Sequence, residues 1–140
     1  MKPTHSFLIL AFLFCVACGG DSAEPGDCAE AYCPFIGNWS LSELYEDGDP
    51  SDDDYSAYKL NLKQPESGDS YGEYQRTFST GVSETGYWTL LNNNDVLELS
   101  NDSGVEEYIV ESVGGNTLVL IIERMPIKPG PGEFRMVFGK

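Results

Sequence analysis

Histidine is almost missing from this sequence. The 140 residues include a single one, His5, which lies shortly before the apolar run Phe7–Ala17. That run is too short to span a bilayer and has the length of a signal-peptide core, so we expect it to be removed together with His5. The mature chain then has no imidazole, which excludes Ser–His and Cys–His nucleophile pairs.

Other signs of enzymatic machinery are equally scarce. No segment shows a helical period over three turns, so no glycine-rich phosphate loop opens a helix. Two carboxylates could still carry out glycoside hydrolysis. No pair, such as Glu84 and Glu98, has a spacing that sets it apart from ordinary surface charge. We therefore expect a protein that is not an enzyme and that binds no cofactor.

Basic residues are also few, because 8 Lys and Arg stand against 23 Asp and Glu, giving a formal net charge of -15. Such a surface repels nucleic-acid phosphates and anionic lipid, so we expect neither as a partner. The acidic stretch Glu46–Asp54 offers oxygen ligands that suit calcium, but it lacks the glycine and glutamate positions of an EF-hand. We expect a solvated loop there and no metal site, with calcium binding as the alternative.

The apolar run ends at Val16-Ala17-Cys18, where two small residues precede a cysteine. This resembles a bacterial lipobox and implies a lipoprotein signal peptide over residues 1–17, with palmitate or a related acyl chain on Cys18. Gly19 after that cysteine implies the outer membrane. We thus expect a cell-envelope lipoprotein that touches the membrane only through its lipid. An ordinary signal peptide cut near Ala17 is the alternative.

Residues 18–32 are rich in glycine, serine, alanine, proline and acid, which predicts a flexible tether. Two cysteines, Cys28 and Cys33, remain at its end. In an oxidising compartment we expect them to form a disulfide bond with each other. A metal thiolate pair would lack further cysteine or histidine ligands. The folded domain is expected over residues 33–140.

From Pro34 onward the chain alternates apolar and polar residues in short runs separated by turn residues. The expected strands are Ile36–Leu44, Tyr58–Lys63, Tyr71–Ser79, Glu84–Leu91, Val96–Ser100, Val105–Val113, Thr117–Arg124 and Glu133–Phe138. Eight short strands joined mostly by hairpin turns predict an all-β fold, an eight-stranded antiparallel up-and-down barrel. A two-sheet sandwich is the alternative.

Gly37-Asn38-Trp39 at the start of the first strand resembles the G-x-W signature of the lipocalins. Later strands, from Gly86-Tyr87-Trp88 to Thr117–Leu120, are similar to those of small bacterial lipocalin-like lipoprotein domains. The resemblance covers Pro34–Lys140 and implies a barrel that is either a ligand cup or packed solid. It also implies a barrel-closing cation–π contact, in which Arg124 or Arg135 covers Trp39, and we take Arg135 for this role.

Alternation also predicts which side chains point inward. The apolar set is Tyr58, Leu60, Leu62, Tyr74, Phe78, Trp88, Leu90, Leu97, Leu99, Tyr108, Val110, Leu118, Leu120, Phe134 and Met136. Arg76 shares their parity, and a buried guanidinium needs an anion. A fatty acid carboxylate or an interior glutamate would supply one, unless a bulge turns Arg76 into water. The candidate ligand-binding residues are Tyr74, Arg76, Trp88, Tyr108 and Phe134.

Two functions fit these features. The first is a lipid-anchored, cell-envelope binding module for a small apolar or fatty-acid-like ligand. The second is a packed barrel that serves as a structural or protein-interaction module without a small ligand. The strand Thr117–Arg124 is apolar on both faces, so Val119 and Ile121 are expected to be covered by another part of the chain or by a partner.

Overall fold

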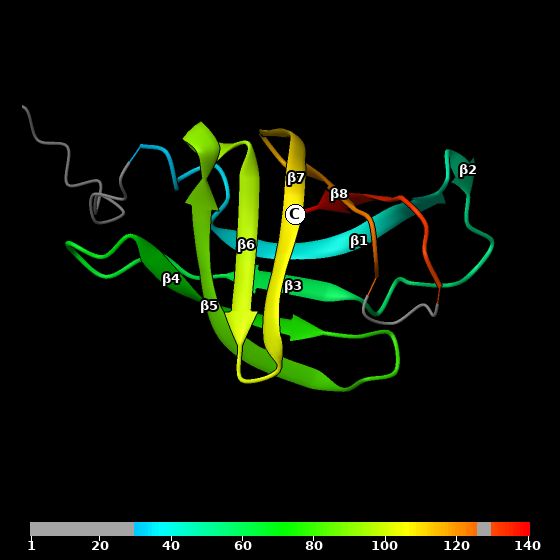
Figure 1. Cartoon of the computed structure of the whole chain (residues 1–140), viewed down its shortest axis with the longest axis horizontal. Helices are drawn as coiled ribbons and strands as arrows, with labels where there is room; N and C mark the ends of the chain where they lie inside the picture. The colour runs from blue at the N-terminus through cyan, green and yellow to red at the C-terminus, as the bar shows by residue number, and fades with distance from the viewer. Residues whose placement is uncertain (1–29, 126–129) are drawn as a thin grey trace, which may run out of the picture.

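The structure, a computed structural model, describes residues 30–125 and 130–140. These residues form nine strands and one short 3-10 turn, η1 (Asn92–Asn94). The strands are β1 (Gly37–Glu46), β2 (Asp49–Pro50), β3 (Lys59–Leu62), β4 (Tyr71–Thr77), β5 (Ser83–Leu91), β6 (Val96–Asn101), β7 (Gly104–Gly114), β8 (Thr117–Ile122) and β9 (Phe134–Gly139). Figure 1 shows them curving around one another.

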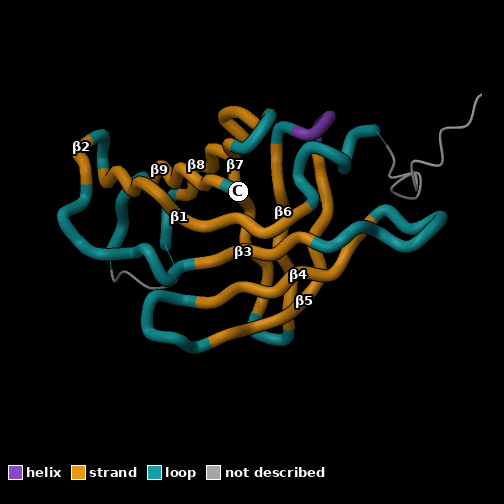
Figure 2. The backbone as a smooth tube through the Cα atoms, turned by 180° about the vertical axis from the view of Figure 1, so that it is seen from behind, coloured by secondary structure: helices purple, strands orange, loops and turns teal. Residues whose placement is uncertain are grey.

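The sheet closes on itself. Apart from the two-residue β2, each strand pairs antiparallel with the next along the chain, and β9 returns to pair with β1. The expected eight-stranded up-and-down barrel is therefore confirmed, and β2 only extends β1 at one end. β1 joins the two sides by pairing with β3 through its first residues and with β9 through its last, and Figure 2 shows it running between them.

Strand alternation builds the core. Every second residue is buried in β4 and again in β9, because their other side chains face outward. All fifteen apolar side chains expected inside belong to the core cluster or pack against it. On the outer side of β8, Val119 is buried opposite Val137 of β9, while Ile121 is half-buried. The chain itself thus covers part of the outer apolar face of this strand.

Trp39 lies at the end of the barrel where the chain enters. Its indole is fully buried and donates a hydrogen bond to the Phe35 carbonyl at 2.6 Å. The Phe35 and Tyr32 rings pack on Trp88, and the Tyr32 hydroxyl donates to the Ser70 carbonyl at 2.7 Å. The segment before β1 therefore covers this end of the barrel.

The cation over Trp39 is Lys140 and not Arg135. The Lys140 ammonium lies 4.3 Å from the centre of the Trp39 ring, whereas Arg135 lies over Tyr45 and bonds to Glu111. Arg135 points outward because its neighbours Phe134 and Met136 point in, which corrects the expectation from the sequence. Gly37 leaves room for the lysine, since a Cβ there would lie 2.8 Å from the Lys140 Cε.

The acidic stretch forms a loop at the opposite end of the barrel and folds back on β1 through β2. The Asp47 carboxylate accepts the Glu133 amide at 3.0 Å, and Asp54 accepts the Ser56 amide at 2.9 Å. These acids therefore help to fix the turns of the loop. Among residues 30–125 and 130–140, no three His, Cys, Asp or Glu side chains are placed to hold a metal ion together.

Several features expected from the sequence lie outside the described residues. They are the signal peptide over residues 1–17, the lipidation site Cys18, nearly all of the tether over residues 18–32, and Cys28. Cys33 is described, but its expected partner is not, so the disulfide remains a prediction. Within the described part of the chain, no helix has the length and apolar character to cross a membrane.

Candidate functional site

Among the residues that the structure describes, the interior holds one buried charge, Arg76, near the end of the barrel that carries the acidic loop. Its side chain is 1% exposed, and it follows the buried Gly72 and Tyr74 on the inner side of β4. The expected inward direction is therefore observed. A guanidinium in this position requires anionic partners, because an isolated buried charge is far less stable than a hydrated one.

Two glutamates from neighbouring strands supply those anions. Glu84 of β5 lies directly opposite Arg76, accepts a hydrogen bond from its Nε at 2.9 Å and forms an ion pair with its Nη2. Glu106 of β7 takes both terminal nitrogens, at 2.6 and 2.9 Å. The fork of the arginine is thus held between two carboxylates, the arrangement for which a planar guanidinium is best suited.

Aromatic residues complete this network. Arg76 Nη1 also donates to the Tyr108 hydroxyl at 2.7 Å, and Tyr108 donates to Glu106. Phe78 lies under the guanidinium carbon at 4.8 Å. Tyr74 donates to Glu84 at 3.0 Å and accepts from the Asn101 amide at 2.9 Å. We call Tyr74, Arg76, Glu84, Glu106 and Tyr108 the arginine cluster.

Burial and hydrogen bonding shift the pKa values of the cluster. Burial tends to raise the pKa of Glu106, but the bonds from Arg76 and Tyr108 outweigh it and the pKa is lowered. Burial also raises the pKa of Tyr108 well above its usual range. The cluster therefore keeps the Glu106 carboxylate charged and its tyrosines neutral at ordinary pH.

The structure brings together three of the five candidate ligand residues, Tyr74, Arg76 and Tyr108. Trp88 lies toward the other end of the barrel, which the segment before β1 covers, and its indole donates a hydrogen bond to the Lys63 carbonyl at 2.8 Å. Phe134 is buried opposite Ile122. The expectation of an interior glutamate as a possible partner of Arg76 is borne out. The sequence argument did not say which glutamates, because it collected mainly apolar inward residues. Strand parity does contain them, since Glu84 precedes Gly86 and Trp88 and Glu106 precedes Tyr108 at intervals of two.

The cluster satisfies its own hydrogen bonds. In the described part of the chain, no buried side-chain nitrogen or oxygen lacks a partner. An interior arranged in this way can fix the positions of β4, β5 and β7 relative to one another. It presents no unpaired cation to an incoming anionic group.

Tyr74 allows a test by alkaline titration. Burial, followed by its hydrogen bond to Glu84, raises its pKa to about 12 from an ordinary value of 10.0. Because the folded-state pKa is the higher one, the stability that Tyr74 contributes is fully present below pH 10.0 and lost as pH rises through about 12. Absorbance titration of Tyr74→Phe should lack one tyrosine that ionises near pH 12. Loss of a group that ionises near pH 10 would contradict this assignment.

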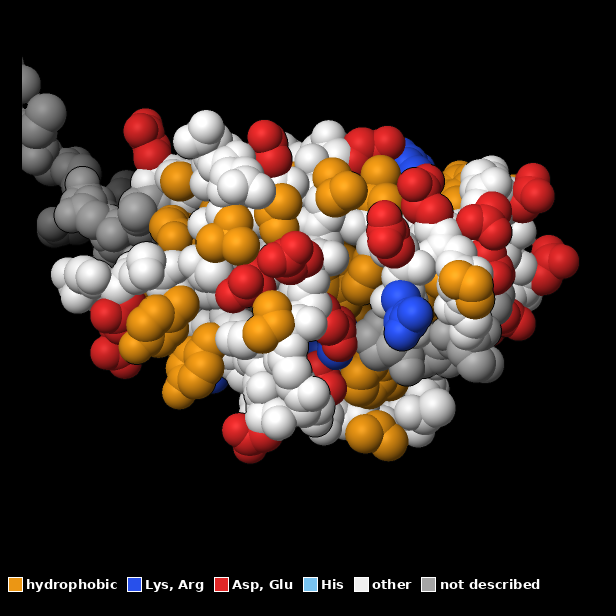
Figure 3. All heavy atoms as spheres, viewed as in Figure 1, with side chains coloured by type: hydrophobic (Ala, Val, Ile, Leu, Met, Phe, Trp, Pro, Cys, Tyr) orange, Lys and Arg blue, Asp and Glu red, His pale blue; other side chains and the backbone are white. Residues whose placement is uncertain are grey.

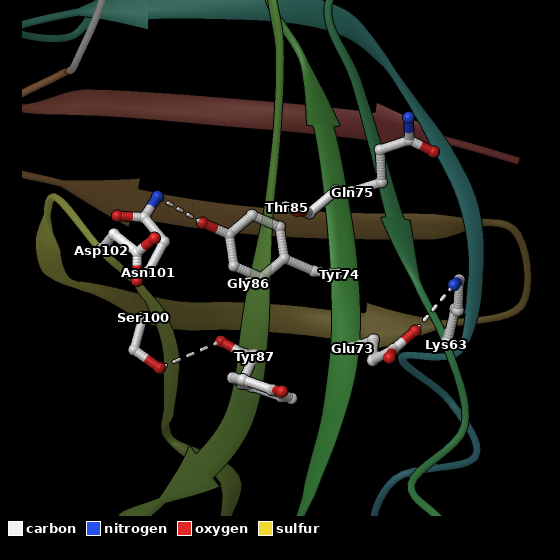
Figure 4. A pocket seen from close by; sticks show the side chains of 10 residues that line it. All are labelled: Lys63, Glu73, Tyr74, Gln75, Thr85, Gly86, Tyr87, Ser100, Asn101 and Asp102. Atoms are coloured by element: carbon white, nitrogen blue, oxygen red, sulfur yellow. Dashed lines mark hydrogen bonds and ion pairs between the residues drawn. The ribbon is translucent and has the colours of Figure 1, made fainter.

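The outer wall carries a polar cleft of about 640 Å³ where β4, β5 and the end of β6 meet. Figure 4 shows Lys63 and Glu73 meeting at one side, at 2.8 Å, and Asn101 reaching Tyr74 at the other. Gly86 also lines the cleft, and a Cβ at this position would clash with the Ser100 carbonyl oxygen, 2.1 Å away. Tyr87 also lines the cleft and is 53% exposed.

Comparison with known proteins agrees with this architecture. A family model described as a lipocalin-like domain matches residues 35–120, which is more than half of the chain. The chain belongs to the lipocalin-like domain family. Within this lipocalin-like domain, the match runs from Phe35, before Trp39, to Leu120 in β8 and includes the whole arginine cluster. β9 and Lys140, which close the barrel, lie beyond the matched residues.

A search of curated proteins finds no match to the chain. A lipocalin-like barrel is consistent with a binding module, and the family match adds no ligand or partner to that statement. What this domain binds must therefore be argued from its own residues.

Proposed function

We propose that this lipocalin-like domain is a lipid-anchored binding module of the bacterial cell envelope that recognises a protein on the outside of a packed barrel. The observation that carries the proposal is the arginine cluster. Arg76 is the residue that a fatty acid carboxylate would need as its anchor. Its guanidinium is already bound by Glu84 and Glu106 and is therefore not free for a ligand. Of the two functions expected from the sequence, this favours the module without a small ligand.

A carboxylate ligand would have to displace one of these glutamates. The displaced side chain, which is 25% exposed for Glu84 and 29% exposed for Glu106, would lose its ion pair while most of it stays buried. Breaking such a pair costs about 3–5 kcal/mol, which cancels most of what a new ion pair with the ligand would contribute. In this proposal Tyr74, Trp88, Tyr108 and Phe134 serve as packing residues of the interior.

The cellular address rests on the sequence alone. The apolar leader, the cysteine at position 18 and the polar stretch after it favour a lipid anchor followed by a spacer. The described chain begins next to the Trp39 end of the barrel, so a tether would hold that end toward the membrane. The outer wall would then remain open to soluble or membrane-attached partners in the envelope.

Titration with a fluorescent fatty acid tests the packed interior. We expect the full chain to cause no saturable increase in probe fluorescence. The chain is purified in detergent, and the detergent concentration in the titration is kept below its critical micelle concentration. Saturable one-to-one binding to the unmodified chain, competed by palmitate, would overturn the proposal and restore the ligand cup.

A further inference from the structure

The outer wall of β4 to β7 carries most of the large exposed apolar side chains of the described chain. Four of its five large exposed apolar side chains lie there, namely Tyr71, Tyr87, Val105 and Ile109, each between 47% and 61% exposed. They point outward because their neighbours Gly72, Trp88 and Tyr108 point in. The rings of Tyr71 and Tyr87 pack edge to face at 5.3 Å. Exposed apolar groups gathered in this way mark interaction surfaces more often than scattered ones do.

Two carboxylates lie in the middle of this surface. Glu98 of β6 and Glu107 of β7 are directly opposite each other in the register, and both point outward. Opposed residues of an antiparallel pair have neighbouring side chains, so like charges at such positions destabilise the sheet. Neither carboxylate has an ion-pair partner among the described residues.

The register fixes the surroundings of this carboxylate pair. Val96 and Ile109 face each other on one side of it, and Ser100 and Val105 on the other. On β5, Thr89 lies opposite Glu98. In Figure 1 the strands β5, β6 and β7 lie toward the viewer, and Figure 3 shows the same side of the molecule. On this side, apolar side chains surround a group of acidic ones.

One hollow reaches the carboxylate pair and another lies near it. The polar cleft is lined by Tyr87 and Ser100, which pair with each other two residues along β5 and β6 from Thr89 and Glu98, and by neither carboxylate. A second hollow of about 500 Å³ reaches the carboxylate pair from the other side. Its lining includes Val96, Val105, Glu107 and Ile109, two residues of β8, and Arg124 beyond the end of β8. A partner side chain that lies across the pair can therefore be buried at its flanks and is not restricted to a flat surface.

We propose that this face, formed by Tyr71, Tyr87, Glu98, Val105, Glu107 and Ile109, binds a protein segment that places a lysine or arginine between Glu98 and Glu107 and apolar side chains on either side. The cation would remove the repulsion between the two carboxylates, and the tyrosines would provide the large rigid contacts that dominate many interfaces. The net charge of -15 would accelerate the approach of a basic partner. This inference rests on the proposed function and names the partner class of the outer wall.

A short basic peptide probes this face directly. We expect the full chain to bind a fluorescein-labelled peptide of sequence Gly-Val-Lys-Leu-Lys-Val-Gly, measured by fluorescence polarisation, and to ignore the same peptide with serine in place of lysine. The double substitution Glu98→Gln/Glu107→Gln should weaken binding at least tenfold. Its thermal midpoint should match or exceed that of the unmodified chain, because a like-charge contact is removed.

A second variant that also loses two negative charges, but away from this face, distinguishes a local binding site from general electrostatic attraction of the basic peptide. Asp49→Asn/Asp52→Asn removes two exposed charges from the acidic loop. In Figure 1 this loop lies around β2, at the end of β1 that is farther from β5 and β6. This variant should weaken binding less than twofold. Equal losses in the two variants, or no binding of the basic peptide by the unmodified chain, would overturn the proposal. Neither result alters the fatty acid titration, so failure of this inference is distinguishable from failure of the packed barrel.

Discussion

Replacing Arg76 by methionine is expected to lower the free energy of unfolding by about 3–5 kcal/mol, because it leaves the carboxylates of Glu84 and Glu106, which are only 25% and 29% exposed, without their cation. Methionine retains much of the packing volume, so the loss reports the charge and its hydrogen bonds. The free energy of unfolding of an ordinary domain is about 5–15 kcal/mol, so that loss is a large share of it. Urea denaturation followed by tryptophan fluorescence measures it, since both Trp39 and Trp88 are buried.

Arg135→Met is the matched control. Arg135 also pairs with a glutamate, Glu111 at 2.6 Å, but the two side chains are 39% and 42% exposed. Exposed ion pairs contribute about 0–1 kcal/mol to stability. The free energy of unfolding of this variant should therefore differ from that of the unmodified chain by less than about 1 kcal/mol. Equal effects of the two substitutions would mean that the buried cluster is not a determinant of stability.

Acidity should act in opposite directions on the two chains. In the unmodified chain the folded-state pKa of Glu106 is lowered, so its contribution is present above the unfolded value of about 4.3 and lost as pH falls further. Without Arg76, burial, the largest influence on Glu106, is opposed only by the hydrogen bond from Tyr108, so the pKa of Glu106 is expected to rise. The variant should then gain stability as the carboxyl protonates, and the difference between the chains should shrink below about pH 4.3. A constant difference from pH 7 to pH 3 would contradict the charge argument.

The barrel could be predicted from the sequence because its strands are short, alternate cleanly and end at turn residues. The strand expected at Val96–Ser100 is observed as Val96–Asn101, and the one expected at Val105–Val113 as Gly104–Gly114. β2 could not be predicted, since its two residues become a strand only when the acidic loop returns to β1. Its proline also argues against a strand from local preference alone.

The site was only partly predictable, for two different reasons. Parity placed Arg76 inside and also contained Glu84, Glu106 and Lys140, but charged residues are not expected in a core until a partner is known. The Glu98–Glu107 contact has another origin, because it depends on register. The two-residue turn after Asn101 sets which residues of β6 and β7 are opposite, and alternation within one strand carries no such information.

Replacing Gly72 by alanine is expected to cost about 3 kcal/mol, the upper part of the range for forcing an extra methyl group into a packed core. A Cβ at this position would lie 2.4 Å from the Lys63 carbonyl oxygen and 2.5 Å from the Trp88 Nε1. The indole is 1% exposed and donates to that same carbonyl. The methyl group therefore displaces either the backbone of the strand connection or the hydrogen bond of the buried tryptophan.

Gly114→Ala is the control for this substitution, since it adds the same methyl group to a strand glycine with nothing within 4 Å. Neither glycine has a positive φ, so backbone strain does not distinguish them. Gly114→Ala should be neutral or stabilise by about 0.4–1 kcal/mol through a less flexible unfolded chain. Urea denaturation compares the two, and near-ultraviolet circular dichroism reports the indole. An unchanged spectrum and midpoint for Gly72→Ala would show that Trp88 is not held against β4.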